Sequence, residues 1–345
     1  MAWHIFHGMD GKLPAYVILM QDAHVVYSQT YLLLDWACHI VGVLYVQPRT
    51  GWRKVHNKAF HALKRAAYYF NSRAAQPHRR STFHSIAHGI SFGGGQEVSE
   101  LELFTKLSNR QHRSLGPYVT LTGRGPTTFS TGWWKGVQFS KYVTTRAVSH
   151  TLGPWRHSSV PTLLILEGFK VYGGKNYEYV KNTVKDIRKE LPALRQRYDE
   201  RVGVYPSRSF NLGPQTMSSP HKDIANLAPS WCSITSISDF DLKLGGHLVL
   251  KELGLIVEFL PSSTILIPPA LITHHNLPVK DHETCYSIMQ YAAGGLFRWA
   301  ANGFKTDKAW HEKATAEMKD QRKRDDENRW ANFVDMFTTY DELIE

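Results

Sequence analysis

The stretch "PHKDIANLAPSWCSITSISDFDLKLGGHLVL", residues 220–250, decides the fold. His221 and Asp223 are two positions apart, and side chains at positions i and i+2 of an extended chain share one face. The apolar run after Trp231 and the Gly245-Gly246 pair are typical of short strands joined by a tight turn or bulge. We therefore expect β-structure here, with an imidazole and a carboxylate side by side at its start.

The same residue pattern extends from residue 203 to residue 304, where Gly and Pro separate short apolar runs. This pattern predicts antiparallel strands at 232–237, 247–250, 255–259, 264–267 and 286–291. Helical spacing predicts a helix over 54–72, one or two helices over 177–201 with a break near Pro192, and a charged helical tail over 307–345. The Gly-, Ser-, Thr- and Pro-rich stretch 114–160 predicts mostly loops and short strands.

The composition indicates a globular protein, and the predicted helices and strands place it in the α+β class. The chain has 345 residues, of which 42% are hydrophobic and 21% charged, enough to bury a core. Polar residues interrupt both the first ten positions and the apolar stretch 13–46, so we expect neither a signal peptide nor a membrane span. The three cysteines lack CxxC spacing, which argues against a disulfide framework and favours a reducing intracellular compartment; they are Cys38, Cys232 and Cys285.

The positive charge is concentrated near the N-terminus. The net charge is +11, and residues 37–96 contain no Asp or Glu. Aromatic residues are interleaved with the basic ones in this segment, a pattern typical of proteins that bind nucleic acid. The alternative is a solvated basic face that keeps the protein soluble. The predicted DNA-contacting residues are Arg53, Lys54, Lys64, Arg65, Arg79 and Arg80.

The His221–Asp223 pair is a candidate half of a metal site. Two histidines and one carboxylate on one face of a metal form the facial triad of non-heme Fe(II) oxygenases. One His-x-Asp pair is present, and about one is expected by chance in a chain with this many His and Asp residues, so the pair alone is weak evidence. His274 and His275 follow a second apolar run, and consecutive strand side chains face opposite ways, so only one can complete the triad. The competing interpretation is that these are structural histidines.

Five blocks together resemble the fungal branch of the TET/JBP family of Fe(II)- and 2-oxoglutarate-dependent dioxygenases, which oxidise methyl groups on nucleic-acid bases. They are "FHSIAHGISFGGGQ" (83–96), "FNLGPQT" (210–216), the opening stretch from His221, "PSSTILIPPALITHHNLPV" (261–279) and "YSIMQYAAGGLFRWAANGF" (286–304). The resemblance implies a double-stranded β-helix (jelly-roll or cupin-like) core with flanking helices over 81–306. Residues 1–80 would then be a basic, partly helical extension, and 307–345 a helical tail.

The resemblance also implies site residues. The family's distal histidine precedes an asparagine by two positions, which selects His274, with His275 as the fallback, to join His221 and Asp223 around Fe(II). Ser287 and His247 would contact 2-oxoglutarate, and Asn226 is a weaker candidate for hydrogen bonding in the substrate pocket.

One departure from the family's pattern stands out. The arginine expected two residues before Ser287, which would pair with the far carboxylate of 2-oxoglutarate, is Cys285. A cysteine cannot reproduce a guanidinium–carboxylate pair, whose loss costs about 2–5 kcal/mol. Nearby cations that could replace it are Lys251, Lys280 and Arg298.

The resemblance implies an enzyme that uses molecular oxygen to oxidise methylated bases in DNA, above all 5-methylcytosine, in the nucleus. A stacked base cannot reach such a site, so base flipping is expected. Two alternatives stay open. One is a catalytically degenerate DNA-binding descendant, favoured by Cys285, and the other is an oxygenase for a small molecule or a protein.

Overall fold

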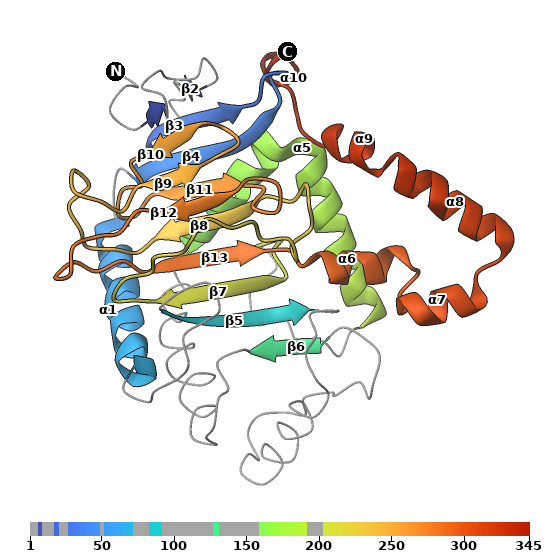
Figure 1. The fold of residues 1–345 in the computed structure, drawn as a ribbon, viewed down its shortest axis with the longest axis horizontal. Helices are drawn as coiled ribbons and strands as arrows, with labels where there is room; N and C mark the ends of the chain where they lie inside the picture. The colour runs from blue at the N-terminus through green and yellow to red at the C-terminus, as the bar shows by residue number, and fades with distance from the viewer. Residues whose placement is uncertain are drawn as a thin grey trace, which may run out of the picture.

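Two antiparallel sheets form the body of the protein. The computed structural model describes residues 6–8, 17–20, 27–48, 52–71, 83–91, 127–130, 159–191 and 203–345. Within these residues a nine-stranded sheet and a four-stranded sheet face each other (Figure 1). The larger sheet has the order β2 (Val17–Met20), β3 (Tyr27–Leu34), β4 (Ile40–Pro48), β11 (Thr264–Ile267), β8 (Cys232–Ser236), β13 (Ser287–Tyr291), β7 (Ser207–Leu212), β5 (His84–Ser91) and β6 (Thr127–Ser130). The smaller has the order β1 (Phe6–Gly8), β10 (Leu255–Val257), β9 (Leu248–Leu250) and β12 (His274–Asn276).

Apolar side chains fill the space between the sheets. Leu44 and Ile265 on the large sheet belong to one buried cluster with Leu250 and Val257 on the small sheet. Each of these side chains is fully or almost fully buried. Burial of a Leu, Ile or Val side chain contributes about 1.5–3 kcal/mol, so this layer holds the two sheets together.

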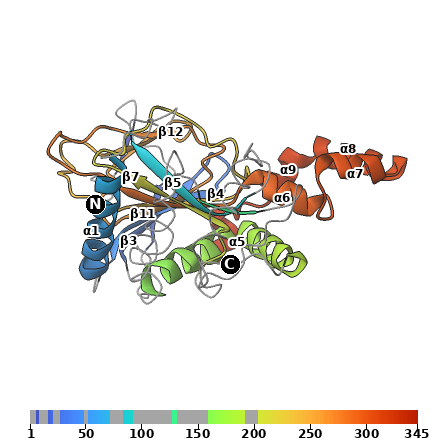
Figure 2. The same ribbon diagram turned by 90° about the horizontal axis from the view of Figure 1, so that it is seen from below.

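Two long helices cover the other face of the large sheet, away from β12 (Figure 2). Helix α1 (Trp52–Asn71) packs Ala59, Leu63 and Ala67 against a cluster on β7 and β13. Helix α5 (Ser159–Glu190) packs through Phe169 and its neighbours, and its helical geometry is interrupted at Gly174.

The described strands among the first eighty residues, β1 to β4, belong to the two sheets, whereas the resemblance implied only a basic, partly helical extension over 1–80. Strand β4 pairs with β11, with Tyr45 opposite Thr264. A Cβ atom at Gly42 would lie 2.7 Å from the carbonyl oxygen of Leu266, so the glycine allows the close approach of these two strands. The boundary expected at residue 80 therefore divides elements of a single sheet.

The C-terminal residues leave the body and return to it (Figure 1). After α6 (Gly294–Ala301) come α7 (Asp307–Lys313), α8 (Ala316–Glu327), α9 (Arg329–Val334) and α10 (Tyr340–Ile344). Thr306, Thr315 and Thr339 cap three of these helices, as threonine does when its hydroxyl accepts a free backbone N–H. The segment is tied back to β4, where the Ile40 N–H donates to the carbonyl of Thr338 at 2.8 Å.

Most of the predicted elements are confirmed. The helix over 54–72 is α1, the five predicted strands are β8, β9, β10, β11 and β13, and the tail is helical. Helix α5 starts well before the predicted residue 177, and the segment after Leu191 as far as residue 202 lies outside the described residues. Most of 114–160 also lies outside them. Among the described helices none is long and apolar enough to cross a bilayer.

Candidate metal centre

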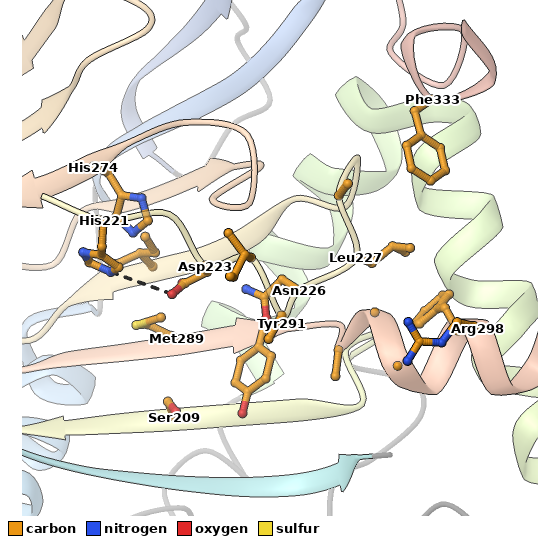
Figure 3. A pocket seen from close by; sticks show the side chains of 18 of the residues that line it. Ser209, His221, Asp223, Asn226, Leu227, His274, Met289, Tyr291, Arg298 and Phe333 are labelled. Carbon is orange, nitrogen blue, oxygen red and sulfur yellow. Dashed lines mark ion pairs between the residues drawn. The ribbon is translucent and has the colours of Figure 1, made fainter. Parts of the chain in front are cut away.

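Three side chains converge at one end of the space between the sheets. One ligand atom from each of His221, Asp223 and His274 lies within 4.8 Å of the other two. The Nε2 atom of His221 is 3.7 Å from a carboxylate oxygen of Asp223, and the two imidazole ring centroids are 4.4 Å apart (Figure 3). Two imidazoles and a carboxylate at this separation are a donor set suited to a first-row divalent metal.

Backbone pairing brings the histidines together although they are far apart in sequence. His221 lies between β7 and β8, and His274 begins β12. The two residues form an antiparallel bridge, with N–H to carbonyl distances of 3.1 Å and 3.0 Å in the two directions. The turn after His221 is fixed in the same way, because the Asp223 N–H donates to the carbonyl of Pro269 at 2.9 Å.

Both imidazoles are oriented for metal binding. The Nδ1 atom of His221 is 2.8 Å from the carbonyl oxygen of Ser219, and that of His274 is 2.9 Å from the carbonyl oxygen of Ile272. Because a carbonyl only accepts, Nδ1 carries the proton in each ring and Nε2 keeps its lone pair. Burial lowers the pKa of His274, which favours the neutral form that a metal requires. The residues therefore fit a bound divalent ion.

Alternation along β12 distinguishes the two neighbouring histidines. His274 is buried and belongs to the cluster, whereas His275 is more exposed and lies outside it. The structure therefore brings His274, and not His275, together with His221 and Asp223, a choice that residue spacing alone could not have made.

An outer carboxylate connects the two segments that carry the ligands. Glu252, in the turn between β9 and β10, pairs with the ammonium of Lys222 at 2.8 Å. It also accepts hydrogen bonds from the backbone N–H and the hydroxyl of Thr273, at 2.6 Å and 2.8 Å. Lys222 lies between two ligands and Thr273 immediately precedes the third. Burial raises the pKa of the Glu252 carboxyl, but the hydrogen bonds from Lys222 and Thr273 outweigh it and hold the pKa at about 2.

The three candidate ligands open into a large cavity. Its volume is about 1330 Å³, and both sheets contribute to its walls, Leu248 from the small sheet and Met289 from the large one. Figure 3 shows the three ligands at one end, with Arg298 and Phe333 at the other. The far wall is formed by α6 and by the inward side of α8 and α9. The C-terminal segment, which sequence reasoning treated only as a tail, therefore lines the cavity.

The position of the missing arginine is occupied by neutral groups. The thiol of Cys285 accepts hydrogen bonds from the hydroxyls of Thr216, at 3.3 Å, and Ser238, at 3.5 Å. Burial raises the pKa of this thiol, so it is uncharged at neutral pH. The Lys and Arg side chains among the described cavity residues are Arg298, Arg322 and Arg329, all from α6, α8 and α9.

Ser287 lies beside this neutral pocket and has a defined hydrogen-bond direction. The amide of Asn211 donates to the Ser287 hydroxyl oxygen at 2.8 Å, and Ser85 donates to the Asn211 carbonyl at 2.8 Å. Because the oxygen of Ser287 accepts from Asn211, its own proton remains available to a ligand in the cavity. Asn211 belongs to the "FNLGPQT" block, but nothing in its pattern marked it as a site residue.

The cations considered as substitutes for the arginine lie elsewhere. Arg298 is on α6, beyond the opposite end of β13, and pairs with Asp307 at 3.1 Å. Lys251 and Lys280 are exposed and are not among the cavity residues that the structure describes. His247, one residue before β9, is likewise not among them.

Asn226 does line the cavity, with its amide 3.4 Å from the sulfur of Cys232. Asn276, two residues after His274, is a further cavity residue. It accepts from the Ser218 N–H at 2.9 Å and donates to the carbonyl of Thr216 at 2.5 Å, so it fixes the segment beside the neutral pocket.

The predicted DNA-contacting residues that the structure describes are not at the metal centre. Arg53, Lys54, Lys64 and Arg65 are exposed on α1, on the far face of the large sheet. Arg79 and Arg80 lie outside the described residues.

Comparison with known proteins finds similar solved structures but no similar sequence. No protein-family model and no curated protein matches the sequence. Solved structures similar to this chain include NgTET1 in complex with 5mC DNA, with a TM-score of 0.38 and 14% identity over 81% of this chain and 82% of that one. A viral collagen prolyl hydroxylase from Paramecium Bursaria Chlorella virus-1, in complex with 2OG, has a TM-score of 0.22 and 11% identity over 33% of this chain and 71% of that one. At these scores the likeness carries no functional assignment, which has to come from the site itself.

Proposed function

We propose that this protein is a non-heme Fe(II)- and 2-oxoglutarate-dependent dioxygenase that oxidises the methyl group of methylated bases in DNA, 5-methylcytosine above all. The observation that carries the proposal is the convergence of His221, Asp223 and His274 at the end of a large cavity. We further infer that the two facing sheets form a double-stranded β-helix, in which the site occupies the open end.

The three ligands would hold the iron through two Nε2 atoms and one carboxylate oxygen. Such a triad leaves positions open on the metal, and the bound iron with its co-substrate supplies the activation of molecular oxygen. The protein's own contribution is positioning. Carbonyl groups orient both imidazoles, Glu252 connects the ligand-bearing segments, and the buried wall keeps water from His274.

The 2-oxoglutarate site would lie beside Cys285. The far carboxylate of the co-substrate would meet hydroxyl and amide donors there, Ser287 in particular, instead of a guanidinium. Neutral donors stabilise a carboxylate less than a charge-assisted pair does. We therefore expect a working site with a raised requirement for 2-oxoglutarate.

The size of the cavity supports a substrate larger than a typical small molecule. Its volume of about 1330 Å³ exceeds the roughly 300–1,000 Å³ of ordinary ligand pockets. A flipped nucleobase together with a co-substrate is a suitable occupant, and Asn226 on the wall offers a hydrogen-bonding amide. The net charge of +11 favours a polyanionic substrate over a protein or a neutral metabolite, and action on DNA would place the protein in the nucleus.

Two measurements test the proposal. Anaerobic titration with Fe(II) and 2-oxoglutarate should produce the visible charge-transfer absorption of a metal–2-oxoglutarate chelate. Mass spectrometry of a 5-methylcytosine oligonucleotide, incubated with both and with air, should then show a gain of one oxygen atom per methylated base. A chelate without base oxidation would contradict the assigned substrate and favour an oxygenase for a small molecule or a protein.

Cys285 favours a second candidate, a catalytically degenerate protein that keeps the fold and binds DNA. On this alternative the ligands would still bind a metal, because their geometry is intact. Metal binding without the charge-transfer band at any attainable 2-oxoglutarate concentration would establish it and exclude the first candidate.

A further inference from the structure

Helix α1 has two sharply different faces. Ala59, Leu63 and Ala67 are at most 3% exposed and pack against Phe210 and Ile288. The other face carries an exposed basic stripe, defined here as Arg53, Lys54, Lys58, His61, Lys64 and Arg65. At 3.6 residues per turn these six residues fall within an arc of roughly 140°.

Within the part of the chain that the structure describes, the stripe has no compensating negative charge. Helix α1 contains no Asp or Glu. In the described part of the chain none of its five Lys and Arg side chains forms an ion pair. A row of unpaired cations does not stabilise the helix, because each cation repels its neighbours. It is suited to a polyanion.

The stripe and the candidate metal centre lie on opposite sides of the large sheet. On β7, Phe210 faces α1 while Ser209 and Asn211 line the cavity. On β13, Ile288 faces α1 while Ser287 and Met289 line the cavity. Figure 2 shows α1 and β12 on either side of the sheet. The stripe therefore cannot hold the nucleotide that enters the cavity.

We infer that the basic stripe of α1 is a second nucleic-acid contact surface, which binds the phosphate backbone of a DNA duplex at a distance from the metal centre. The inference extends the proposed function, since it assigns the duplex a contact that the cavity does not provide. From Arg53 to Arg65 the stripe is about 18 Å long, enough to reach phosphates on both sides of a major groove about 12 Å wide.

The chemistry of the stripe favours a duplex over a membrane surface. The apolar face of α1 is buried in the protein, so the helix cannot insert it between lipids. Among the described side chains of α1, the large exposed apolar one on the stripe's side is Tyr68, 74% exposed, which suits contact with sugar or base edges.

A salt titration tests the inference. The triple variant Lys58→Gln/Lys64→Gln/Arg65→Gln removes three stripe charges, and its affinity for a labelled 30-base-pair duplex is measured by fluorescence anisotropy without metal or 2-oxoglutarate. Each lost phosphate contact lowers the slope of log K against log salt by about 0.9, so the slope should fall by about 2 to 3. The matched control is Lys181→Gln/Lys185→Gln/Lys189→Gln on exposed positions of α5, which removes the same charge and should change the slope less.

The outcomes separate this inference from the proposed function. A slope that is unchanged, or that falls equally in the α5 control, overturns the stripe as a contact surface, as does tighter binding to anionic vesicles than to the duplex. Binding is measured without catalysis. The salt slopes therefore show whether the stripe contacts the duplex even if the protein oxidises no base. If oxidation is observed, turnover of a methylated trinucleotide should be the same in the triple variant and the wild type.

Discussion

The ammonium of Lys222 lies 2.8 Å from the carboxylate of Glu252, and this contact joins the first ligand-bearing segment to the turn between β9 and β10. Through Thr273 the same carboxylate reaches the residue before His274. Neither Lys222 nor Glu252 would bind the metal. Outer partners of this kind hold ligands in place before the metal arrives, and their loss typically lowers metal affinity about 10–100-fold.

Replacing this carboxylate should therefore weaken metal binding. We expect Glu252→Gln to lower the affinity for Co(II), used as a spectroscopic substitute for Fe(II), by about 10–100-fold, with a change in the visible spectrum of bound Co(II). Glu252→Asp should restore part of the loss. The matched control is Glu258→Gln, a charge removed outside the cluster. Equal affinity in Glu252→Gln and wild type would show that the ligand segments hold themselves in place.

The same carboxylate predicts a pH dependence. Its folded-state pKa is about 2, below the usual 4.5, so its stabilising contribution is present above pH 4.5 and is lost as the pH falls toward 2. The difference in free energy of unfolding between wild type and Glu252→Gln should accordingly shrink over that interval. Chemical denaturation from pH 2 to pH 7 measures this difference. A difference that stays constant would contradict a stabilising role for the ionised Glu252 carboxylate.

The two adjacent histidines offer a sharp comparison. His274→Ala should reduce metal affinity beyond the about 10–100-fold expected for an outer partner, because it removes a ligand. His275→Ala, one residue away on the other face of β12, should leave it nearly unchanged. Isothermal titration calorimetry with Co(II) distinguishes the two, and a larger effect at position 275 would reassign the third ligand.

Restoring the arginine should improve co-substrate binding. We expect Cys285→Arg to lower the 2-oxoglutarate concentration needed for half-saturation by about thirty-fold to several thousand-fold, which corresponds to about 2–5 kcal/mol. Cys285→Ser keeps the size and neutrality of the side chain and should have little effect. If the arginine variant behaves like the serine variant, another cation already binds the carboxylate.

Stability measurements test whether α1 belongs to the sheet. Leu63 is 1% exposed in the contact between α1 and the sheet, so Leu63→Ala should lower the free energy of unfolding by about 2–5 kcal/mol. Lys64→Ala, the exposed neighbour, should change it by no more than about 0.5 kcal/mol. Similar small effects at both positions would mean that α1 is only loosely attached.

Local patterns predicted much of the C-terminal half. Short apolar runs punctuated by Gly and Pro located β8 to β11 and β13. Strands β3 and β4 were missed because they lie almost wholly within one longer apolar stretch, 13–46, in which no Gly or Pro separates the first strand from the second. The pairing of β4 with β11 spans more than two hundred residues, which no local pattern records.

In the candidate site, too, local patterns were predicted and long-range contacts were missed. The spacing of His221 and Asp223 indicated that their side chains share one face, and the family resemblance selected His274. Glu252 and Asn211 were not found, because their roles come from hydrogen bonds to residues distant in sequence. The basic segment was recognised from composition, but the face it occupies depends on how α1 packs.

The position of a bound ion tests the central claim most directly. Crystals grown with Mn(II) and without oxygen should show one strong anomalous peak at about 2.0–2.2 Å from Nε2 of His221, Nε2 of His274 and a carboxylate oxygen of Asp223. A peak held by other residues, or no peak at these three side chains at saturating Mn(II), would contradict the metal centre and the oxygenase function with it.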